Sequence, residues 1–332
     1  MDLAYWLPII YMAAMGLALL IYVILDGYDL GVGMLMPLAN EQEKDLMVAS
    51  IGPFWDANET WIVLGVGILL IAFPLAHGIV LTALYLPVTI MLMGLILRGV
   101  AFDLRVKAGD HRKGLWNKAF FLGSLIASTA QGWMLGSYVT GLEPGGTNLL
   151  FSALIALTLP ALYLILGCGW LLMKTEGELL TKSINWARKA IWPMGLGLLM
   201  VSLATPVVSE VIADKWFTWP NMLMLAPIPL LSAACFGGIV YLLQRDNWIY
   251  RGRGWLLYVL TVAICVLASL GLAYSLFPNI IIGQMTIWDA SASVSSLLFT
   301  LVGVVLTLPM ILAYTIFVYK IFHGKATELR YD

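Results

Sequence analysis

Charged residues are scarce in this chain of 332 residues. Asp, Glu, Lys and Arg together make up 11%, whereas 61% of the residues are hydrophobic and the mean hydropathy is +0.92. A typical soluble domain carries about 25% charged residues, so this deficit excludes an ordinary soluble protein and indicates a protein that crosses a membrane several times. The net charge of −1 also argues against nucleic acid as a partner, because nucleic-acid-binding domains carry a basic excess.

Cysteine and histidine, the commonest ligands of protein-bound transition metals, are also rare. The three cysteines fall in separate apolar stretches without CxxC spacing: Cys168, Cys235 and Cys265. This pattern argues against an iron–sulfur or zinc site and predicts small buried side chains. The three histidines fall outside the predicted membrane helices: His77, His111 and His323. Because a haem-binding membrane subunit is expected to offer imidazoles from within its helices, any haem that this chain serves is expected to be ligated elsewhere.

Long apolar runs fill most of the sequence. A helix needs about 20 apolar residues to cross the bilayer, and nine runs meet this length, at about 7–28, 54–75, 78–101, 118–139, 148–173, 190–213, 221–244, 255–277 and 295–321. The runs are continuous rather than alternating, and each backbone polar group in lipid must be satisfied within its own segment. We therefore predict an all-α polytopic fold with nine transmembrane helices in one integral membrane domain, residues 1–332.

The distribution of Lys and Arg predicts the orientation. Basic residues collect in alternate connections and in the C-terminal tail. The connections at residues 140–147 and 278–294 contain no Lys or Arg. By the positive-inside rule the basic connections are cytoplasmic, so we expect a periplasmic N-terminus and a cytoplasmic C-terminus in a bacterial inner membrane. The start MDLAYWLPII lacks a basic region and a cleavage site, so the first span is expected to be retained.

Acidic residues at the edges of two spans are the first candidate site. Asp26 and Asp29 close the first predicted span, and Asp56 and Glu59 open the second. Carboxylates at the rim of hydrocarbon are costly unless paired or wetted, and a spacing of three places each pair on one helix face. With Arg98 at the end of the third span, all lie at the cytoplasmic edge and suggest a path for protons or cations.

Structural explanations of the same residues stay open. Asp56 and Glu59 in a first helical turn favour the helix dipole, and Arg98 would neutralise one acid and hold the helices in register. Asp26 and Asp29 fit this account less well, because negative charge is disfavoured at a helix C-terminus. Nearby glycines, such as Gly27, admit either close helix packing or a chain of water molecules.

Several sequence runs resemble subunit II of the cytochrome bd-type quinol oxidases, and in particular the cyanide-insensitive branch. They are LDGYDLGVGML, GPFWDANETWIVLG, LYLPV followed by LILRGVAFDLR, QGWMLGSYVTGL and MTIWDASAS, in this order along nearly the whole chain. The first two runs together are specific for this family, whereas the pattern DGxDxGxG by itself would not identify it.

The resemblance implies a terminal oxidase that oxidises quinol, with ubiquinol as the expected substrate, and reduces dioxygen to water. It implies a partner, subunit I, that holds two b-type haems and one d-type (or b-type) haem, and a fold of two four-helix bundles plus one peripheral helix. It also implies that Trp55 and Asp56 stand at the cytoplasmic point of proton uptake, with Asp29 and Arg98 matching further family positions, whereas Glu59 matches less securely. A small third subunit, bound lipid and a structural quinone in this chain stay open.

Two other functions compete with this interpretation. A proton- or cation-coupled secondary transporter would also place acids in helices, but broken helices with paired polar sites near the midplane of both halves are expected there. A purely structural subunit would need none of the acids for proton transfer.

Overall fold

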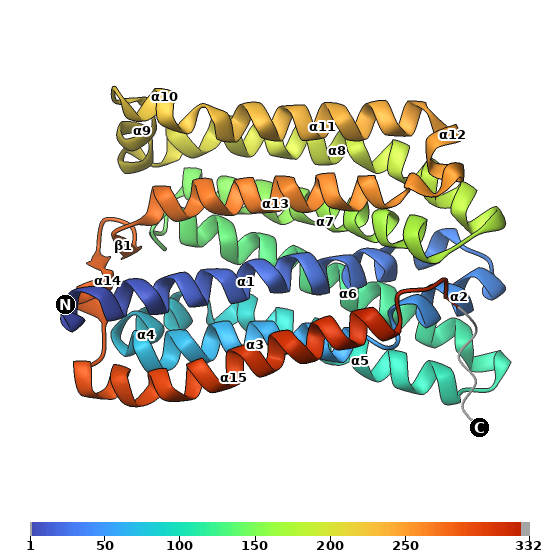
Figure 1. Ribbon diagram of the computed structural model, residues 1–332, viewed down its shortest axis with the longest axis horizontal. Helices are drawn as coiled ribbons and strands as arrows, with labels where there is room; N and C mark the ends of the chain where they lie inside the picture. The colour runs from blue at the N-terminus through green and yellow to red at the C-terminus, as the bar shows by residue number, and fades with distance from the viewer. Residues whose placement is uncertain (1, 327–332) are drawn as a thin grey trace.

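The structure is a computed structural model that describes residues 2–326, and nearly all of its regular structure is helical (Figure 1). The elements are α1 (Leu3–Leu35), η1 (Met36–Leu38), α2 (Glu41–Ile51), α3 (Trp55–Ala72), α4 (Pro74–Ala83), α5 (Tyr85–Lys107), α6 (Asp110–Val139), α7 (Gly146–Lys174), α8 (Gly177–Val208), α9 (Glu210–Phe217), α10 (Asn221–Leu225), α11 (Pro227–Gln244), α12 (Asp246–Trp248), η2 (Ile249–Arg253), α13 (Trp255–Leu276), β1 (Asn279–Ile281), β2 (Met285–Thr286), α14 (Ile287–Ala290) and α15 (Val294–Ile321).

Within the described residues, 8 helices are long and apolar enough to cross a membrane. This confirms the predicted class, an all-α polytopic membrane protein. The candidate for the ninth span is α6, which has 30 residues but is less apolar along its length than the other long helices. Its buried face carries polar side chains, among them Ser124, Ser128 and Gln131. The count of nine therefore stays a prediction that depends on α6.

Several helix boundaries differ from the predicted ones. The first helix continues to Leu35 instead of ending near residue 28, and α8 begins at Gly177, so a basic stretch predicted as a connection is helical. The second and third spans are separated by a short helix, α4, that contains His77, which was predicted to lie in a loop. Apolar composition marks where a helix enters lipid, and hydrogen bonding continues the helix beyond that point.

The long helices lie nearly parallel in two groups (Figure 1). Contacts join α1, α3, α5 and α6 in one group, and α7, α8, α11 and α13 in the other, while α15 lies on the outside against α1 and α3. The two groups meet where α1 and α6 pack on α7. Gly31 and Gly167 face each other there, and a Cβ atom on Gly167 would lie 2.6 Å from the carbonyl carbon of Gly31. Small residues thus permit close approach of the backbones, as at many membrane helix interfaces.

One end of the bundle is stabilised by α2, a short helix that lies outside the predicted spans. Asn40 and Glu43 form a capping box at its start, which satisfies otherwise free backbone N–H groups. Glu43 also accepts a hydrogen bond from Lys182 of α8 at 2.8 Å, and Asp45 pairs with Arg105 of α5 at 2.8 Å. Helix α2 therefore ties both helix groups together at the end that was predicted to be cytoplasmic.

Candidate functional site

Two buried aspartates of α1 form the core of the candidate site. Asp26 and Asp29 are each 0% exposed, and their spacing of three residues places them on neighbouring positions of one helix face. The prediction that they close the helix is wrong, since α1 continues to Leu35. They lie inside the helix, so the argument from the dipole at its C-terminus does not apply, and their burial must be compensated by side chains of other helices.

Arg98 of α5 is the main compensating group. It is 1% exposed, and its Nη1 donates to Oδ1 of Asp26 at 2.6 Å, while its Nη2 donates to Oε1 of Glu59. The guanidinium carbon lies 6.0 Å from the centre of the Trp55 ring. One buried cation thus connects α1, α3 and α5, and this is the pairing that the sequence suggested for Arg98.

Asp29 has a different set of partners. Its Oδ2 accepts a hydrogen bond from Nδ2 of Asn58 on α3 at 2.8 Å. The same amide lies 2.9 Å from the hydroxyl of Tyr28, which lies 2.6 Å from the hydroxyl of Tyr319 on α15. Tyr319 in turn donates to Oδ1 of Asn58 at 3.2 Å. This closed polar network is buried among α1, α3 and α15.

The charges of the cluster do not balance within the described residues. The cluster holds three carboxyl groups and one guanidinium: Asp26 and Glu59 pair with Arg98, and Asp29 accepts from Asn58 instead. Oδ2 of Asp26 and Oδ1 of Asp29 are buried without a hydrogen-bond partner. Because an uncompensated buried charge is costly, this arrangement suits a site that holds exchangeable protons. The described residues contain no group of three side chains suited to a metal ion.

The predicted residues at the start of α3 lie at different depths. Trp55 is half-buried and packs against Phe102, with ring centres 4.9 Å apart. Asp56, the next residue, is exposed. Glu59 follows about one helical turn further on, with 26% of its side chain exposed. The three acids Asp56, Glu59 and Asp26 therefore run from the surface to the interior. Trp61, two residues after Glu59, is 1% exposed inside the protein.

Sequence reasoning missed several polar residues of this region. Asn58 and Tyr319 were not predicted, and neither was a second network, in which Gln131 donates to Tyr22 at 2.7 Å and accepts from Tyr163 at 2.7 Å. Asn58 and Gln131 are amides inside long apolar helices, which is a signal that the sequence offers. The tyrosines gave no such signal in the sequence, because tyrosine is common in membrane helices as an interfacial residue.

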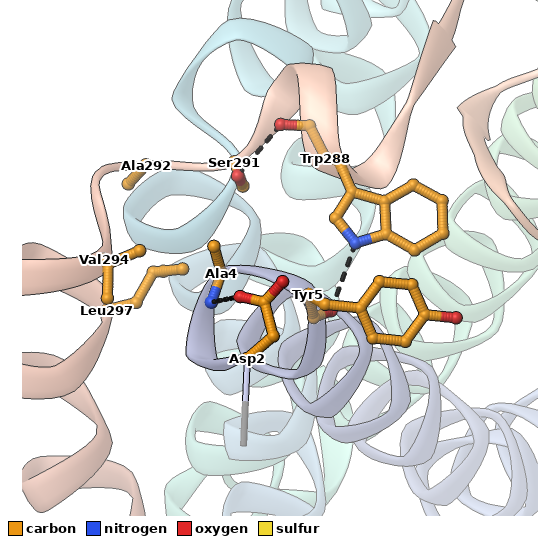
Figure 2. A pocket seen from close by; sticks show the side chains of 8 residues that line it. All are labelled: Asp2, Ala4, Tyr5, Trp288, Ser291, Ala292, Val294 and Leu297. Atoms are coloured by element: carbon orange, nitrogen blue, oxygen red, sulfur yellow. Dashed lines mark hydrogen bonds between the residues drawn. The ribbon is translucent and has the colours of Figure 1, made fainter.

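A hollow lies at the opposite end of the bundle from the cluster (Figure 2). It has a volume of about 490 Å³ between the start of α1 and the segment from α14 to α15. The rings of Tyr5 and Trp288 stack there, and Nε1 of Trp288 donates to the carbonyl of Tyr5 at 3.1 Å. Asp2 caps α1 from this hollow by accepting from the N–H of Ala4. The hollow is open and shares no residue with the acidic cluster, so we place the candidate site at the cluster, where the buried charges lie.

Glu41, at the start of α2 and outside the spans, behaves as an ordinary charged surface group. A hydrogen bond from Lys44 lowers the pKa of Glu41 in α2. The carboxyl of Glu41 also accepts from Asn117 of α6 at 3.0 Å. A stable negative charge at this end of the molecule is consistent with a wetted edge of the bundle.

Comparison with known proteins gives matches along most of the chain. The family model described as cytochrome bd terminal oxidase subunit II matches residues 7–322. The cytochrome bd ubiquinol oxidase subunit 2 of Bacillus subtilis (strain 168) is 27% identical over 326 residues, with 92% of each chain covered. The cytochrome bd-I ubiquinol oxidase subunit 2 of Escherichia coli (strain K12) is 26% identical over 371 residues, covering 97% of this chain and 96% of that protein.

A solved structure has a similar fold. A chain of the bd oxidase from Geobacillus thermodenitrificans aligns with a TM-score of 0.77 at 17% identity, covering 95% of this chain and 98% of that chain. The structural similarity extends over both helix groups, because the alignment covers nearly all of both chains.

Proposed function

This chain belongs to the family of cytochrome bd terminal oxidase subunit II, and on that premise we propose that its acidic cluster carries protons from the cytoplasm toward the site of oxygen reduction. Family membership makes the chain a subunit of a quinol oxidase in a multi-pass inner-membrane complex, and it favours this function over a secondary transporter. The cyanide-insensitive branch, the third subunit and a structural quinone stay predictions.

The eight apolar spans of the described residues lack the imidazole groups that commonly ligate haem. None of the eight apolar spans within residues 2–326 contains a histidine, and His77 lies in the short helix α4. Axial ligation of haem by imidazole from within the bundle is therefore not available in these spans. We propose that subunit I holds the two b-type haems and the d-type (or b-type) haem, and that this chain supplies protons and structural support.

The order of the acids supports a direction for the path. Asp56 is exposed at the start of α3, Glu59 is partly exposed one turn later, and Asp26 and Asp29 are fully buried. A proton taken up at Asp56 would pass to the carboxyl groups around Arg98 and then along the interface with subunit I. Since quinol releases its protons on the outer side, charge crosses the membrane without a pump. The observation that carries this proposal is the excess of buried carboxyl groups around one arginine.

The exposed acid provides the direct test. Asp56→Asn in the assembled oxidase is expected to lower oxygen consumption and voltage generation in vesicles about tenfold, because one proton-transfer group contributes at least that much. Glu178→Gln is the matched control, since Glu178 is 73% exposed and lies in the other helix group. Unchanged oxygen consumption and unchanged voltage with Asp56→Asn would remove Asp56 from the path.

A purely structural role for this subunit predicts the opposite result. In that case the acids could be neutralised without loss of turnover as long as the complex assembles. Recovery of the full haem spectrum in the Asp56→Asn complex therefore has to accompany the activity measurement. Assembly with lost turnover supports proton transfer, and assembly with full turnover supports the structural role.

A further inference from the structure

A second hollow lies where α8 and α11 approach the end of the bundle that carries α2 and α12 (Figure 1). Its volume is about 400 Å³, and its lining is polar: Arg188, Gln244, Arg245, Asp246, Asn247 and Trp248. None of these residues lies on α1, α3 or α5, so the hollow is separate from the acidic cluster.

One arginine of the hollow is occupied by the protein itself. Nε and Nη2 of Arg188 donate to the carbonyl of Leu243 at 3.0 and 2.8 Å, and Nη2 also pairs with Asp246. Arg188 thus caps the end of α11 and neutralises the one acid of the lining. No negative charge is left in the lining to offset further cations.

Two other arginines are exposed and oriented by aromatic rings: Arg245 lines the hollow, and Arg253 lies beside it, over the ring of the lining residue Trp248. The guanidinium carbon of Arg245 lies 5.0 Å from the ring centre of Tyr241, and that of Arg253 lies 4.9 Å from the ring centre of Trp248. Among residues 2–326 neither arginine has an acidic partner within ion-pair distance. Stacking on a ring leaves the N–H groups of a guanidinium free to donate in its plane, so both are available to an external acceptor.

The hollow is also at the edge of the lipid-facing surface. Further along the two helices, α8 exposes Leu196 and Leu199, which are 58% and 57% exposed, and α11 exposes Leu230 and Leu231 near its start, which are 67% and 52% exposed. Tyr241 and Trp248 are in edge-to-face contact, with ring centres 6.1 Å apart, and aromatic residues of this kind mark the level of the headgroups. A lipid with its headgroup at the hollow could therefore extend its hydrocarbon chains along α8 and α11.

We propose that this hollow binds the phosphate group of an anionic diacyl phospholipid from the adjacent leaflet. Guanidinium groups match the planar oxygen pairs of a phosphate, and basic pockets beside membrane helices are a common form of lipid headgroup site. The excess positive charge selects an anionic lipid over a zwitterionic one. The exposed leucines select a lipid over a free phosphate ion.

Native mass spectrometry of the purified oxidase complex tests the proposal. The delipidated complex is titrated with phosphatidylglycerol, with phosphatidylcholine of the same chain length, and with inorganic phosphate. The variant is the double substitution Arg245→Gln and Arg253→Gln, which leaves Arg188 and its cap on α11 intact. Arg112→Gln is the matched control, because Arg112 is an exposed arginine in the first turn of α6, outside the hollow.

We expect one phosphatidylglycerol molecule to bind wild type and Arg112→Gln equally, and to bind the double variant at least about tenfold more weakly, which corresponds to about 1.4 kcal/mol. Phosphatidylcholine is expected to bind weakly to all three proteins, and millimolar phosphate is expected to displace little lipid. Equal affinity for the two lipids, or unchanged binding by the double variant, would overturn the proposal. Efficient displacement by phosphate would instead assign the site to the free anion.

A photoactivatable phosphatidylglycerol on the wild-type complex gives an independent result that does not rely on variants. Crosslinks are expected on the peptide that spans residues 241–255 and on the part of α8 near Arg188. Crosslinks confined to other segments would place the lipid elsewhere and contradict the proposal.

Discussion

The buried guanidinium of Arg98 has carboxylate partners on two different helices, Asp26 on α1 and Glu59 on α3. In the interior of a membrane protein each charge of such an ion pair offsets the cost of burying the other, because either charge alone would be strongly unfavourable. Asp29 lacks a cationic partner of its own and relies on the amide of Asn58. We therefore expect the two aspartates to have different roles, with Asp26 held in the ion pair and Asp29 exchanging a proton.

Arg98→Gln is expected to destabilise the subunit by about 3–5 kcal/mol, because it leaves the buried carboxyl of Asp26 without a cation. The thermal midpoint of the purified complex, followed by the loss of haem absorbance, measures this effect. Combining Arg98→Gln with Asp26→Asn removes both charges and is expected to recover part of the loss. A complex with Arg98→Gln that melts like wild type would show that the ion pair is dispensable.

Asp29→Asn is expected to lower turnover about tenfold or more while the complex still assembles, since an amide keeps the contact with Asn58 but cannot carry a proton. Oxygen consumption of the assembled complex is the measurement. Asp29→Glu is the companion variant and should recover part of the activity, because it restores an ionisable group. Full activity in Asp29→Asn would exclude this residue from proton transfer.

At the scale of helices, the position of α1 against α7 sets the geometry of the cluster. Gly27 and Gly31 of α1 face Tyr163 of α7, and a Cβ atom on Gly31 would overlap the carbonyl oxygen of Tyr163. The glycines beside the aspartates therefore serve close packing, one of the two interpretations that the sequence left open. The α1 backbone at Gly31 has no room for a file of water molecules on the side that faces α7.

Gly31→Ala is expected to separate α1 from α7 and to cost about 1–3 kcal/mol, as overpacking of a dense interior does. Gly16→Ala on the same helix is the control, because no heavy atom lies within 4 Å of the position that its methyl carbon would take. The thermal midpoints of the two complexes can be compared directly. Equal midpoints would contradict the close packing of α1 on α7.

At the scale of the whole molecule, α1 begins at one end of the bundle and α15 finishes at the other (Figure 1). The predicted count of nine spans agrees with this arrangement, with α6 as the ninth, because an odd number of crossings places the two ends of a chain on opposite sides of a membrane. The basic connections, α2 and the end of α15 share one end, which the positive-inside rule assigns to the cytoplasm. The exposed start of the acid series at Asp56 lies toward this same end, as proton uptake from the cytoplasm requires.

Fusion proteins test this orientation. A green fluorescent protein attached after the last residue is expected to fluoresce, because the end of α15 is predicted to face the cytoplasm. A protease site placed before Asp2 is expected to be cut from the periplasmic side of spheroplasts. Cleavage only after the membrane is permeabilised would invert the topology and with it the direction of proton uptake.

The class of the protein and the set of its charged residues were accessible from the sequence. Continuous apolar runs leave the helix as the one way to satisfy backbone hydrogen bonds in lipid, and the rarity of charge makes each intramembrane acid conspicuous. The resemblance carried by runs such as GPFWDANETW also pointed to the family that the later comparisons show. Helix ends were less well predicted, because α1 and α8 continue past their apolar segments.

What only the tertiary structure decided is which polar groups meet. Tyr319 of α15 reaches Asn58 across a sequence separation of 261 residues, and Gln131 joins two tyrosines of different helices. Hydropathy and spacing describe one helix at a time, so they could place Asp26 and Asp29 on a common face but could not name the amide that holds Asp29. Those partners follow from the approach of α1, α3, α5 and α15, which depends on the packing of small residues and on the ion pairs of Arg98.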